Sequence, residues 1–148
     1  MSVLPILLLL LTQPSAPDDV LAAYEPGHTT IMVEGAEATF PYRLHRPTTA
    51  SADNPLPLVI FLHGRSETGN DNQMQLRRFP KQMLTEPHLM RHQAFVLAPQ
   101  CTGGGWSPRA RRGQDPVDPN VPTPSMQALI KKIRELAQDP SVDRSRIY

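Results

Sequence analysis

Two short, continuous apolar runs constrain the fold of this 148-residue chain more than any other feature. Residues 58–62 read LVIFL and residues 94–98 read AFVLA, without polar residues at alternate positions. Strands of this kind are buried on both faces, as in parallel sheets that helices cover. Between the two runs, residues 74–84 place apolar side chains at roughly helical spacing, although Pro80 must kink or interrupt that helix. This order predicts parallel strands joined by a crossover helix.

The preceding segments predict antiparallel strands. Residues 28–34 (HTTIMVE) and 38–45 (ATFPYRLH) are rich in β-branched and aromatic residues, and Gly35 separates them. Their mixture of polar and apolar side chains is typical of half-exposed antiparallel pairs. Because proline cannot donate to a sheet ladder, Pro41 predicts that the second strand is an edge strand or a bulged one.

After the second apolar run come a long connection, a helix and the start of another strand. Residues 99–124 are rich in Pro, Gly and Arg, and residues 125–138 carry an apolar stripe at helical spacing. Pro124 suits the first turn of this helix, and Asp139-Pro140 ends it. Ile147-Tyr148 begins a further β-type run. The whole pattern predicts an α/β fold, with antiparallel edge strands and then parallel β-α-β-α-β.

Charge and cysteine content narrow the function classes. The net charge of +1 provides no global field for nucleic acid or anionic membranes, so we expect no nucleic-acid partner. The basic stretch 109–112 lies within the long connection, where a solvated loop is favoured over a polyanion site. Cys101 is the only cysteine, which excludes an internal disulfide. His88 and His92 lack a third ligand or an HExxH motif, so we expect neither a metal nor a cofactor.

The first residues resemble a secretory leader. Residues 3–11 (VLPILLLLL) are too short to span a membrane but match the apolar core of a signal peptide. Val20-Leu21-Ala22 provides small residues for a cleavage site, whereas no Lys or Arg precedes Arg43. We expect a signal peptide at residues 1–22, a domain at 23–148, no stable membrane span, and export to the periplasm or the extracellular space. The alternatives are a start codon placed too early or an N-terminal apolar extension, with a cytoplasmic protein.

The loop after LVIFL holds a serine that almost matches a nucleophile elbow. The stretch Gly64–Gly69 (GRSETG) misses the G-x-S-x-G spacing by one residue. Thr68 stands where the second glycine is needed, and a β-branched residue resists positive φ. Ser66 also follows the strand by several residues, with more loop before any helix. We therefore do not expect Ser66 to be a nucleophile. His63-Gly64 directly after a buried strand instead suits a loop whose next N–H, on Arg65, stabilises an oxyanion.

A set of motifs resembles one known family. LPLVIFLHG-R-SETGNDNQMQL, AFVLAPQC followed by G-W, and DPSVDRSRIY occur in the order and spacing of the esterase and "predicted peptidase" branch of the α/β-hydrolase superfamily. Dienelactone-hydrolase-like, carboxylesterase-like and polyhydroxyalkanoate-depolymerase-like enzymes are the relatives. The resemblance covers residues 28–148 and implies the N-terminal part of an α/β-hydrolase fold, truncated before the nucleophile elbow. In that family R-I-Y opens the strand leading to G-x-S-x-G, and the acid and histidine follow.

The resemblance also implies roles for individual residues. His63, Gly64 and Arg65 form the oxyanion loop, with the Arg65 backbone N–H as the donor. Residues 67–72 organise that loop by side-chain hydrogen bonds. The residues implied to border the substrate are Glu67, Gln100, Cys101 and Trp106. Relatives usually carry a small residue at the position of Arg65 and often E-R-G at 67–69, so the bulky Arg65 leaves pocket size and charge open.

These observations predict a fragment of a serine hydrolase that acts on ester or peptide bonds of small molecules. It supplies the oxyanion-hole loop but lacks the catalytic serine, acid and histidine, and we expect it to be inactive alone. Two alternatives stay open. One is a non-catalytic binding protein on half a hydrolase scaffold, which uses the arginines of the long loop. The other is one half of a split enzyme, assembled with a separately encoded partner.

Overall fold

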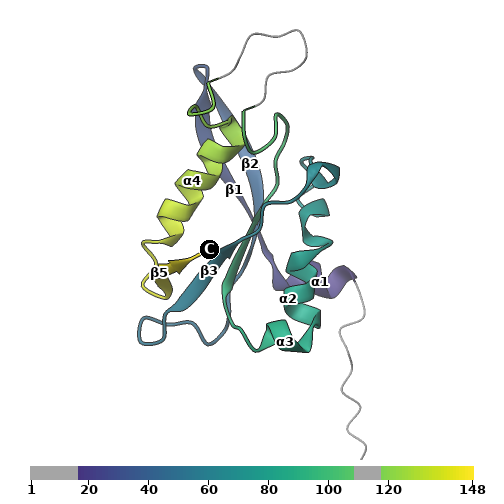
Figure 1. The fold of residues 1–148 in the computed structure, drawn as a ribbon, viewed down its shortest axis with the longest axis vertical. Coiled ribbons are helices and arrows are strands. Elements are labelled where there is room, and N and C mark those ends of the chain that lie inside the picture. Colours follow the sequence, from purple (N-terminus) through teal and green to yellow (C-terminus); the bar gives the residue numbers. More distant parts are fainter. Residues whose placement is uncertain (1–16, 109–117) are drawn as a thin grey trace, which may run out of the picture.

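A five-stranded mixed sheet forms the centre of the computed structural model, which describes residues 17–108 and 118–148 (Figure 1). The strand order is β1-β2-β4-β3-β5. β1 (Glu25–Val33) and β2 (Ala36–His45) are antiparallel, and β2 is antiparallel to β4 (Phe95–Pro99). β3 (Leu56–Ile60) runs parallel to both of its neighbours, β4 and β5 (Val142–Ile147). The predicted α/β architecture is confirmed.

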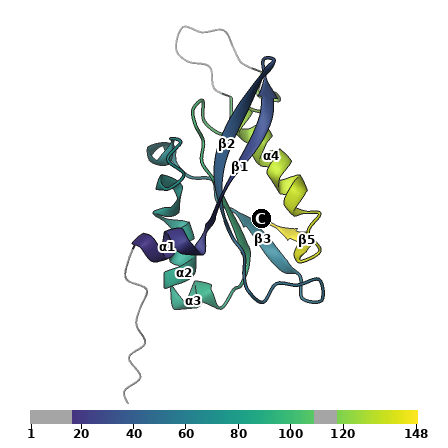
Figure 2. The ribbon, with the colours of Figure 1, turned by 180° about the vertical axis from the view of Figure 1, so that it is seen from behind.

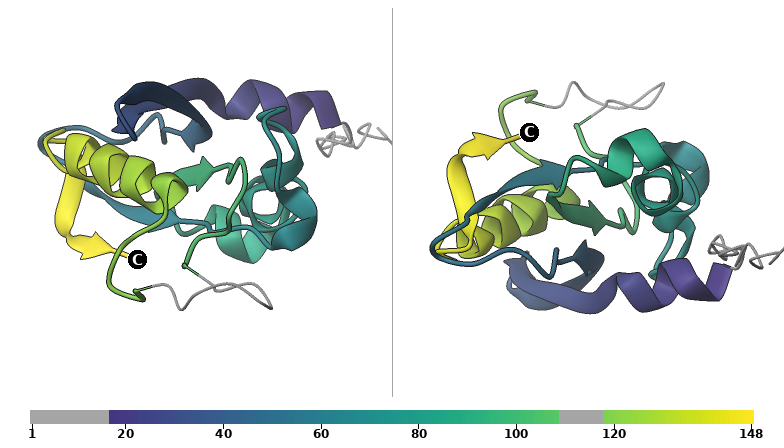
Figure 3. Two further views of the ribbon diagram at one scale, coloured as in Figure 1. Left: turned by 90° about the horizontal axis from the view of Figure 1, so that it is seen from above. Right: turned by 90° about the horizontal axis from the view of Figure 1, so that it is seen from below.

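Helices lie on both sides of this sheet, as Figures 1 and 2 show from opposite directions. α4 (Pro124–Leu136) stands on one side, and α1 (Pro17–Ala23) and α2 (Phe79–Thr85) stand on the other, with the short α3 (Pro87–Met90) following α2. The views along the long axis show α4 and α2 separated by the twisted sheet (Figure 3). Two 3-10 turns, η1 (Arg65–Glu67) and η2 (Met74–Leu76), lead from β3 to α2.

β4 shows why its sequence is continuously apolar. All five of its residues are buried. Phe95 and Leu97 belong to the core cluster that α4 covers, whereas Val96 and Ala98 belong to the cluster beneath α1 and α2. Successive side chains of a strand point to opposite faces, so a strand with helices on both sides needs apolar residues at every position.

Pro41 lies in an interior strand, which differs from the prediction of an edge or bulged strand. β2 stands between β1 and β4, and the Pro41 carbonyl accepts the Gln100 N–H at 2.9 Å. In an antiparallel ladder the nitrogen and oxygen of one residue face the same neighbour. The missing donor of Pro41 therefore faces Gln100, just past the Tyr42–Pro99 pair where the ladder ends. Proline is tolerated because it removes only the last bond of the ladder.

Two other elements differ from the sequence pattern in their limits. The helix predicted at residues 74–84 is divided into η2 and α2, and Pro80 occupies the first turn of α2. β5 begins at Val142, ahead of the predicted start at Ile147. Between the pairs Leu56–Val142 and Leu58–Ile147 the register shifts, so the polar residues of β5 form an irregular segment. That segment concealed the strand, because apolar alternation is the signal by which strands are recognised.

The N-terminal helix packs onto the sheet. Val20 of α1 and the adjacent Tyr24 are buried in the cluster beneath α1 and α2. The predicted boundary between residues 22 and 23 therefore falls inside a packed helix. The apolar core of the predicted leader and the basic stretch 109–112 lie outside the described residues. Within residues 17–108 and 118–148, no helix combines the length and apolarity that crossing a bilayer requires.

Candidate functional site

The loop that follows β3 lies at the carboxyl end of the parallel strands. The Phe61 N–H extends the pairing beyond β3 by donating to the Leu97 carbonyl at 2.9 Å. His63 follows two residues later, with 4% of its surface exposed, and Gly64 then leads into η1. In open α/β sheets, ligands bind outside the carboxyl ends of the strands. The sequence-predicted loop therefore stands where this architecture places its sites.

His63 is hydrogen-bonded through both ring nitrogens. Its Nε2 accepts the Cys101 N–H at 2.9 Å, so the proton of the neutral ring lies on Nδ1. Nδ1 then donates to the Gly64 carbonyl oxygen at 2.7 Å. The Trp106 indole donates to the His63 carbonyl at 3.0 Å, and the two rings meet edge to face at 5.2 Å. His63 is consequently a fixed part of the loop and has no ring nitrogen available for proton transfer.

The peptide group between Gly64 and Arg65 is oriented by two hydrogen bonds. Its carbonyl oxygen accepts from His63 Nδ1 and, at 3.2 Å, from the Glu67 N–H. The peptide is planar and trans, so the Arg65 N–H points away from that carbonyl. No acceptor for this N–H is found among the described residues. Bonds to the carbonyl also polarise the group and strengthen its donor. The described part of the chain thus leaves this fixed N–H free to donate, which is the kind of group that stabilises a developing oxyanion.

Gln100 holds the second half of the loop against the sheet. Its side chain is buried, and its Oε1 accepts the Asn72 N–H at 2.7 Å. Its Nε2 donates to the Glu67 carbonyl at 3.1 Å and to the Asp71 carboxylate at 2.8 Å. Burial tends to raise the pKa of Asp71, but hydrogen bonds from the Gln73 and Met74 amides and from Gln100 hold it below its usual value. Gln100 therefore fixes the positions of Glu67, Asp71 and Asn72 by hydrogen bonds from the end of β4.

Cys101 and Trp106 join the same assembly from the loop after β4. Cys101 is buried, and its thiol donates to the Gly103 carbonyl at 3.2 Å and lies 3.3 Å from the Ser125 hydroxyl. Its carbonyl accepts the Gly69 N–H at 3.0 Å, which ties the two loops together a second time. Trp106 is partly buried against the core beneath α4. The structure therefore brings Gln100, Cys101 and Trp106 together with the His63 loop. Hydrogen bonds hold all three of them in place.

Glu67 is a buried carboxylate with a cationic partner. Its side chain is 7% exposed, and Oε1 accepts from Arg78 Nε at 3.0 Å. The hydrogen bond from Arg78 holds the Glu67 pKa below its usual value, against the effect of burial. Arg78 was not predicted from the sequence. The sequence offered only an indirect signal. A buried acid needs a cationic partner, and Arg77-Arg78, directly before α2, are the nearest arginines that follow the loop.

Ser66 lies in the middle of η1, without the setting of a nucleophile elbow. An elbow joins a strand directly to a helix through a sharp turn. Here η1 is followed by more loop and by η2 before α2 begins. Within the described chain, no group of three His, Cys, Asp or Glu side chains is placed to hold a metal ion.

Comparison with known proteins identifies the fold family. No protein-family model matches the sequence, and no curated protein does either. Among solved structures, the chain is similar to a thermostable esterase, with a TM-score of 0.64 and 30% identity over 87% of this chain. It is also similar, at 16% identity and a TM-score of 0.40, to a protein from Bacteroides ovatus ATCC 8483 assigned as a dipeptidyl aminopeptidase IV, over 84% of this chain and 17% of that one. Only the first of these similarities is close enough to support an argument.

The chain spans about a third of the esterase, 34% of its length. The chain is thus related to the esterases of the α/β-hydrolase superfamily, as its motifs predicted.

Proposed function

We propose that this chain is the N-terminal part of a serine hydrolase that cleaves carboxylic ester bonds of small molecules, and that its role is to supply the oxyanion-hole loop. The observation that carries the proposal is the Gly64–Arg65 peptide, whose carbonyl is fixed by two donors while its N–H has no acceptor among residues 17–108 and 118–148. The 30% identical esterase supports the reaction class. Peptide bonds, which contain the same kind of carbonyl, are the alternative substrate.

The geometry of β5 supports a nucleophile beside this loop. The Tyr148 N–H donates to Leu58 at 2.9 Å, and the Ile60 N–H donates to Tyr148 at 2.8 Å. β5 therefore runs alongside β3 to its carboxyl end, from which the loop with Arg65 departs. A serine a few residues past Tyr148 would stand at the same sheet edge as the Arg65 N–H. This is the position that the family resemblance gives to G-x-S-x-G.

In the proposed reaction, that serine attacks the ester carbonyl while a histidine takes its proton. The carbonyl oxygen becomes negatively charged in the tetrahedral intermediate, and the Arg65 N–H donates to it. The intermediate then collapses and expels the alcohol, which receives the proton from the histidine. The serine, histidine and acid belong to the part of the enzyme beyond this chain, so the chain alone should not catalyse the reaction.

We also propose that the protein is exported, because residues 3–11 match the apolar core of a signal peptide.

Replacing Arg65 by proline tests the donor directly. Proline removes the backbone N–H, and Gly64 has φ −80° and ψ 179°, an extended conformation that proline accepts in the preceding residue. Arg65 is the first residue of η1, where proline is tolerated. Arg65→Ala is the matched control, because it removes the same side chain and keeps the N–H.

The assay is hydrolysis of p-nitrophenyl acetate by the natural full-length protein that carries this chain. Arg65→Pro should lower kcat by about 10²–10³-fold relative to Arg65→Ala, the usual cost of losing one oxyanion donor. Equal activities of the two variants would contradict the role of Arg65. Labelling of the 148-residue chain by a fluorophosphonate, abolished by Ser66→Ala, would instead show that Ser66 is a nucleophile.

A further inference from the structure

Glu67 contacts the oxyanion loop through both its backbone and its side chain. Glu67 occupies the last position of η1, and its backbone N–H binds the Gly64 carbonyl. Its carboxylate also lies against Gly64, since a Cβ on that glycine would stand 3.3 Å from Glu67 Oε2. Both the backbone and the side chain of Glu67 therefore contact Gly64, whose carbonyl carbon is bonded to the Arg65 nitrogen.

This position creates an electrostatic conflict. A carboxylate in a buried, low-dielectric setting is costly without a partner. It would also oppose the negative charge that forms at the Arg65 N–H during acyl transfer, because like charges repel more strongly where water is excluded. The site needs the shape and hydrogen bonds of Glu67 but is harmed by its uncompensated charge.

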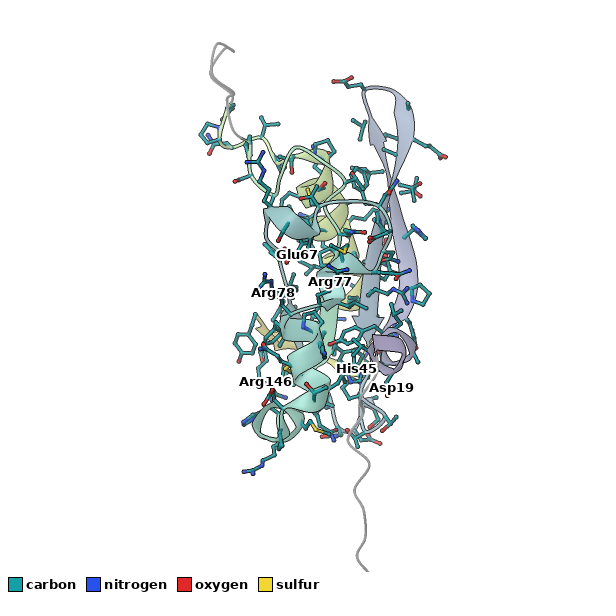
Figure 4. All side chains as sticks on the ribbon, turned by 90° about the vertical axis from the view of Figure 1, so that its right-hand side faces the viewer. Asp19, His45, Glu67, Arg77, Arg78 and Arg146 are labelled. Carbon is teal, nitrogen blue, oxygen red and sulfur yellow. The ribbon has the colours of Figure 1, made fainter. Side chains whose placement is uncertain are left out.

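Arg78 resolves the conflict. It lies directly before α2, and its Nε donates to Glu67 Oε1 at 3.0 Å. Glu67 and Arg78 lie beside each other in Figure 4. The other groups that act on the Glu67 carboxylate are the Ser66 hydroxyl, which is hydrogen-bonded to it, and the His63 ring. Gln100 binds the Glu67 backbone carbonyl and leaves the carboxylate to these three.

We propose that Arg78 is a positioning residue of the oxyanion hole, which acts through Glu67 by fixing its carboxylate under the Gly64–Arg65 peptide and neutralising its charge. This inference rests on the proposed function. Arg78 does not touch the reacting atoms, and it is 73% exposed at its side chain, so the pair is closed on one side by the protein and open to solvent on the other. The loop geometry is therefore coupled to a residue on a different element.

The test compares Arg78→Gln, Arg78→Lys and the control Arg77→Gln. Arg77→Gln removes the same charge one position away, from a residue that is not hydrogen-bonded to Glu67 among the described contacts. In the natural full-length protein, two quantities are measured for each variant. One is the pH profile of p-nitrophenyl acetate hydrolysis, and the other is the titration of the Glu67 carboxyl by NMR, assigned with Glu67→Gln.

Arg78→Gln should lower kcat by about tenfold with little change in KM, less than the 10²–10³-fold cost of losing an oxyanion donor, because the Arg65 N–H is still present. It should also shift the Glu67 titration to higher pH, and the loss of kcat should be largest above that titration, where the carboxylate is charged and unpaired. Arg78→Lys should restore most of both, and Arg77→Gln should change neither. In a Glu67→Gln background, Arg78→Gln should have no further effect on the profile.

Several results would overturn the proposal. Equal profiles for Arg78→Gln and Arg77→Gln would do so, even if Arg78→Gln lowers thermal stability, since a purely structural role predicts that outcome. An unchanged Glu67 titration in Arg78→Gln would do so as well. If the full-length protein hydrolyses no ester, the proposed function fails, and an unshifted titration would show separately that Arg78 does not control Glu67.

Discussion

His63 Nε2 accepts the Cys101 N–H at 2.9 Å, and this bond joins the loop after β3 to the loop after β4. Through Nδ1 the same ring fixes the Gly64 carbonyl. One buried imidazole thus links two strand ends and orients the Arg65 N–H. The loop is held by neighbours from across the sheet, so its conformation depends on residues far from it in sequence.

Replacing His63 by alanine should therefore loosen both loops. The buried Cys101 N–H would lose its acceptor, and an unsatisfied buried amide costs about 1–3 kcal/mol. We expect a loss of about 2–4 kcal/mol in the free energy of unfolding once the lost packing against Trp106 is included. Urea denaturation measures the loss, and hydrogen exchange should be faster at the Cys101 amide. An unchanged exchange rate there would mean that the His63 bond does not hold the loop.

Replacing Gln100 by alanine should cost more than replacing an exposed glutamine. Three hydrogen bonds of the Gln100 side chain disappear, and the Asn72 N–H and Glu67 carbonyl are left without them. We expect a loss of about 2–4 kcal/mol in unfolding free energy. Gln127→Ala is the control, because this exposed side chain makes one bond, to the Pro122 carbonyl. Equal losses for the two variants, measured by chemical denaturation, would contradict the role given to Gln100.

The loss of folding stability at low pH should depend in part on Asp139, which follows α4. Its Oδ1 accepts from the Ser141 hydroxyl at 2.6 Å and from the Ser141 N–H at 2.9 Å. These bonds, first the hydroxyl and then the amide, hold the Asp139 pKa below its usual value. Because the pKa is lower in the folded state, the stabilisation is present above the ordinary pKa of about 3.9 and is lost as the pH falls through the folded value.

Asp139→Asn should accordingly remove a stabilising contribution at pH 7 and leave stability less dependent on pH below the ordinary carboxyl pKa of about 3.9. Thermal unfolding of both proteins across that range measures the difference. Parallel curves for the two proteins would show that Asp139 does not contribute to the pH dependence.

The sequence predicted the strands better than it predicted the site contacts. Both LVIFL and AFVLA were predicted as strands from local residues alone. The expected burial on two faces holds for β4, whereas β3 covers Leu56–Ile60, with Leu58 buried and its other residues half-buried. The interior place of β2 did not follow, because the cost of Pro41 depends on how many ladder bonds it removes, and it removes only the last one, at the point where the pairing with β4 ends. β5 was similarly hidden by its polar residues, whose pairing with β3 is set by the rest of the sheet.

The candidate site was likewise predicted only in part. The motif His63-Gly64-Arg65 was predicted because residue types after a buried strand carry a recognisable chemistry. Arg78 was missed because its relation to Glu67 spans eleven residues and two 3-10 turns, and no local pattern records it. Contacts between loops depend on the three-dimensional path of each loop, which local propensity does not specify.

Gly27 should not tolerate a side chain. It stands directly opposite Tyr42 in the β1–β2 register, and the Tyr42 ring covers it so closely that a Cβ would overlap the ring. The same ring also faces the Lys132 ammonium at 4.8 Å, so its displacement would disturb a second contact. We expect Gly27→Ala to lower the unfolding free energy by about 1–3 kcal/mol. Gly103→Ala is the matched control, because nothing lies within 4 Å of a Cβ there. Equal stabilities in urea would contradict this packing.

The N-terminal boundary of the domain offers a last test. α1 contributes the buried Val20, and Arg43 donates from Nη1 to the Leu21 carbonyl at 3.4 Å and to the Tyr24 carbonyl at 3.0 Å. A protein that begins at residue 23 would lose Val20 and Leu21, whereas one that begins at residue 17 keeps both. We expect the shorter protein to be less stable by about 2–3 kcal/mol, chiefly from the loss of one buried aliphatic side chain.

Val20→Ala and Asp19→Ala in the longer protein provide the point-mutant version of this comparison. Asp19 is exposed and should have little effect, while Val20→Ala should account for about 1–2 kcal/mol of the difference. Denaturation curves measure all four proteins. If the protein beginning at residue 23 were as stable as the one beginning at residue 17, α1 would be dispensable to the domain, and the predicted cleavage after Ala22 would carry no cost to the folded state.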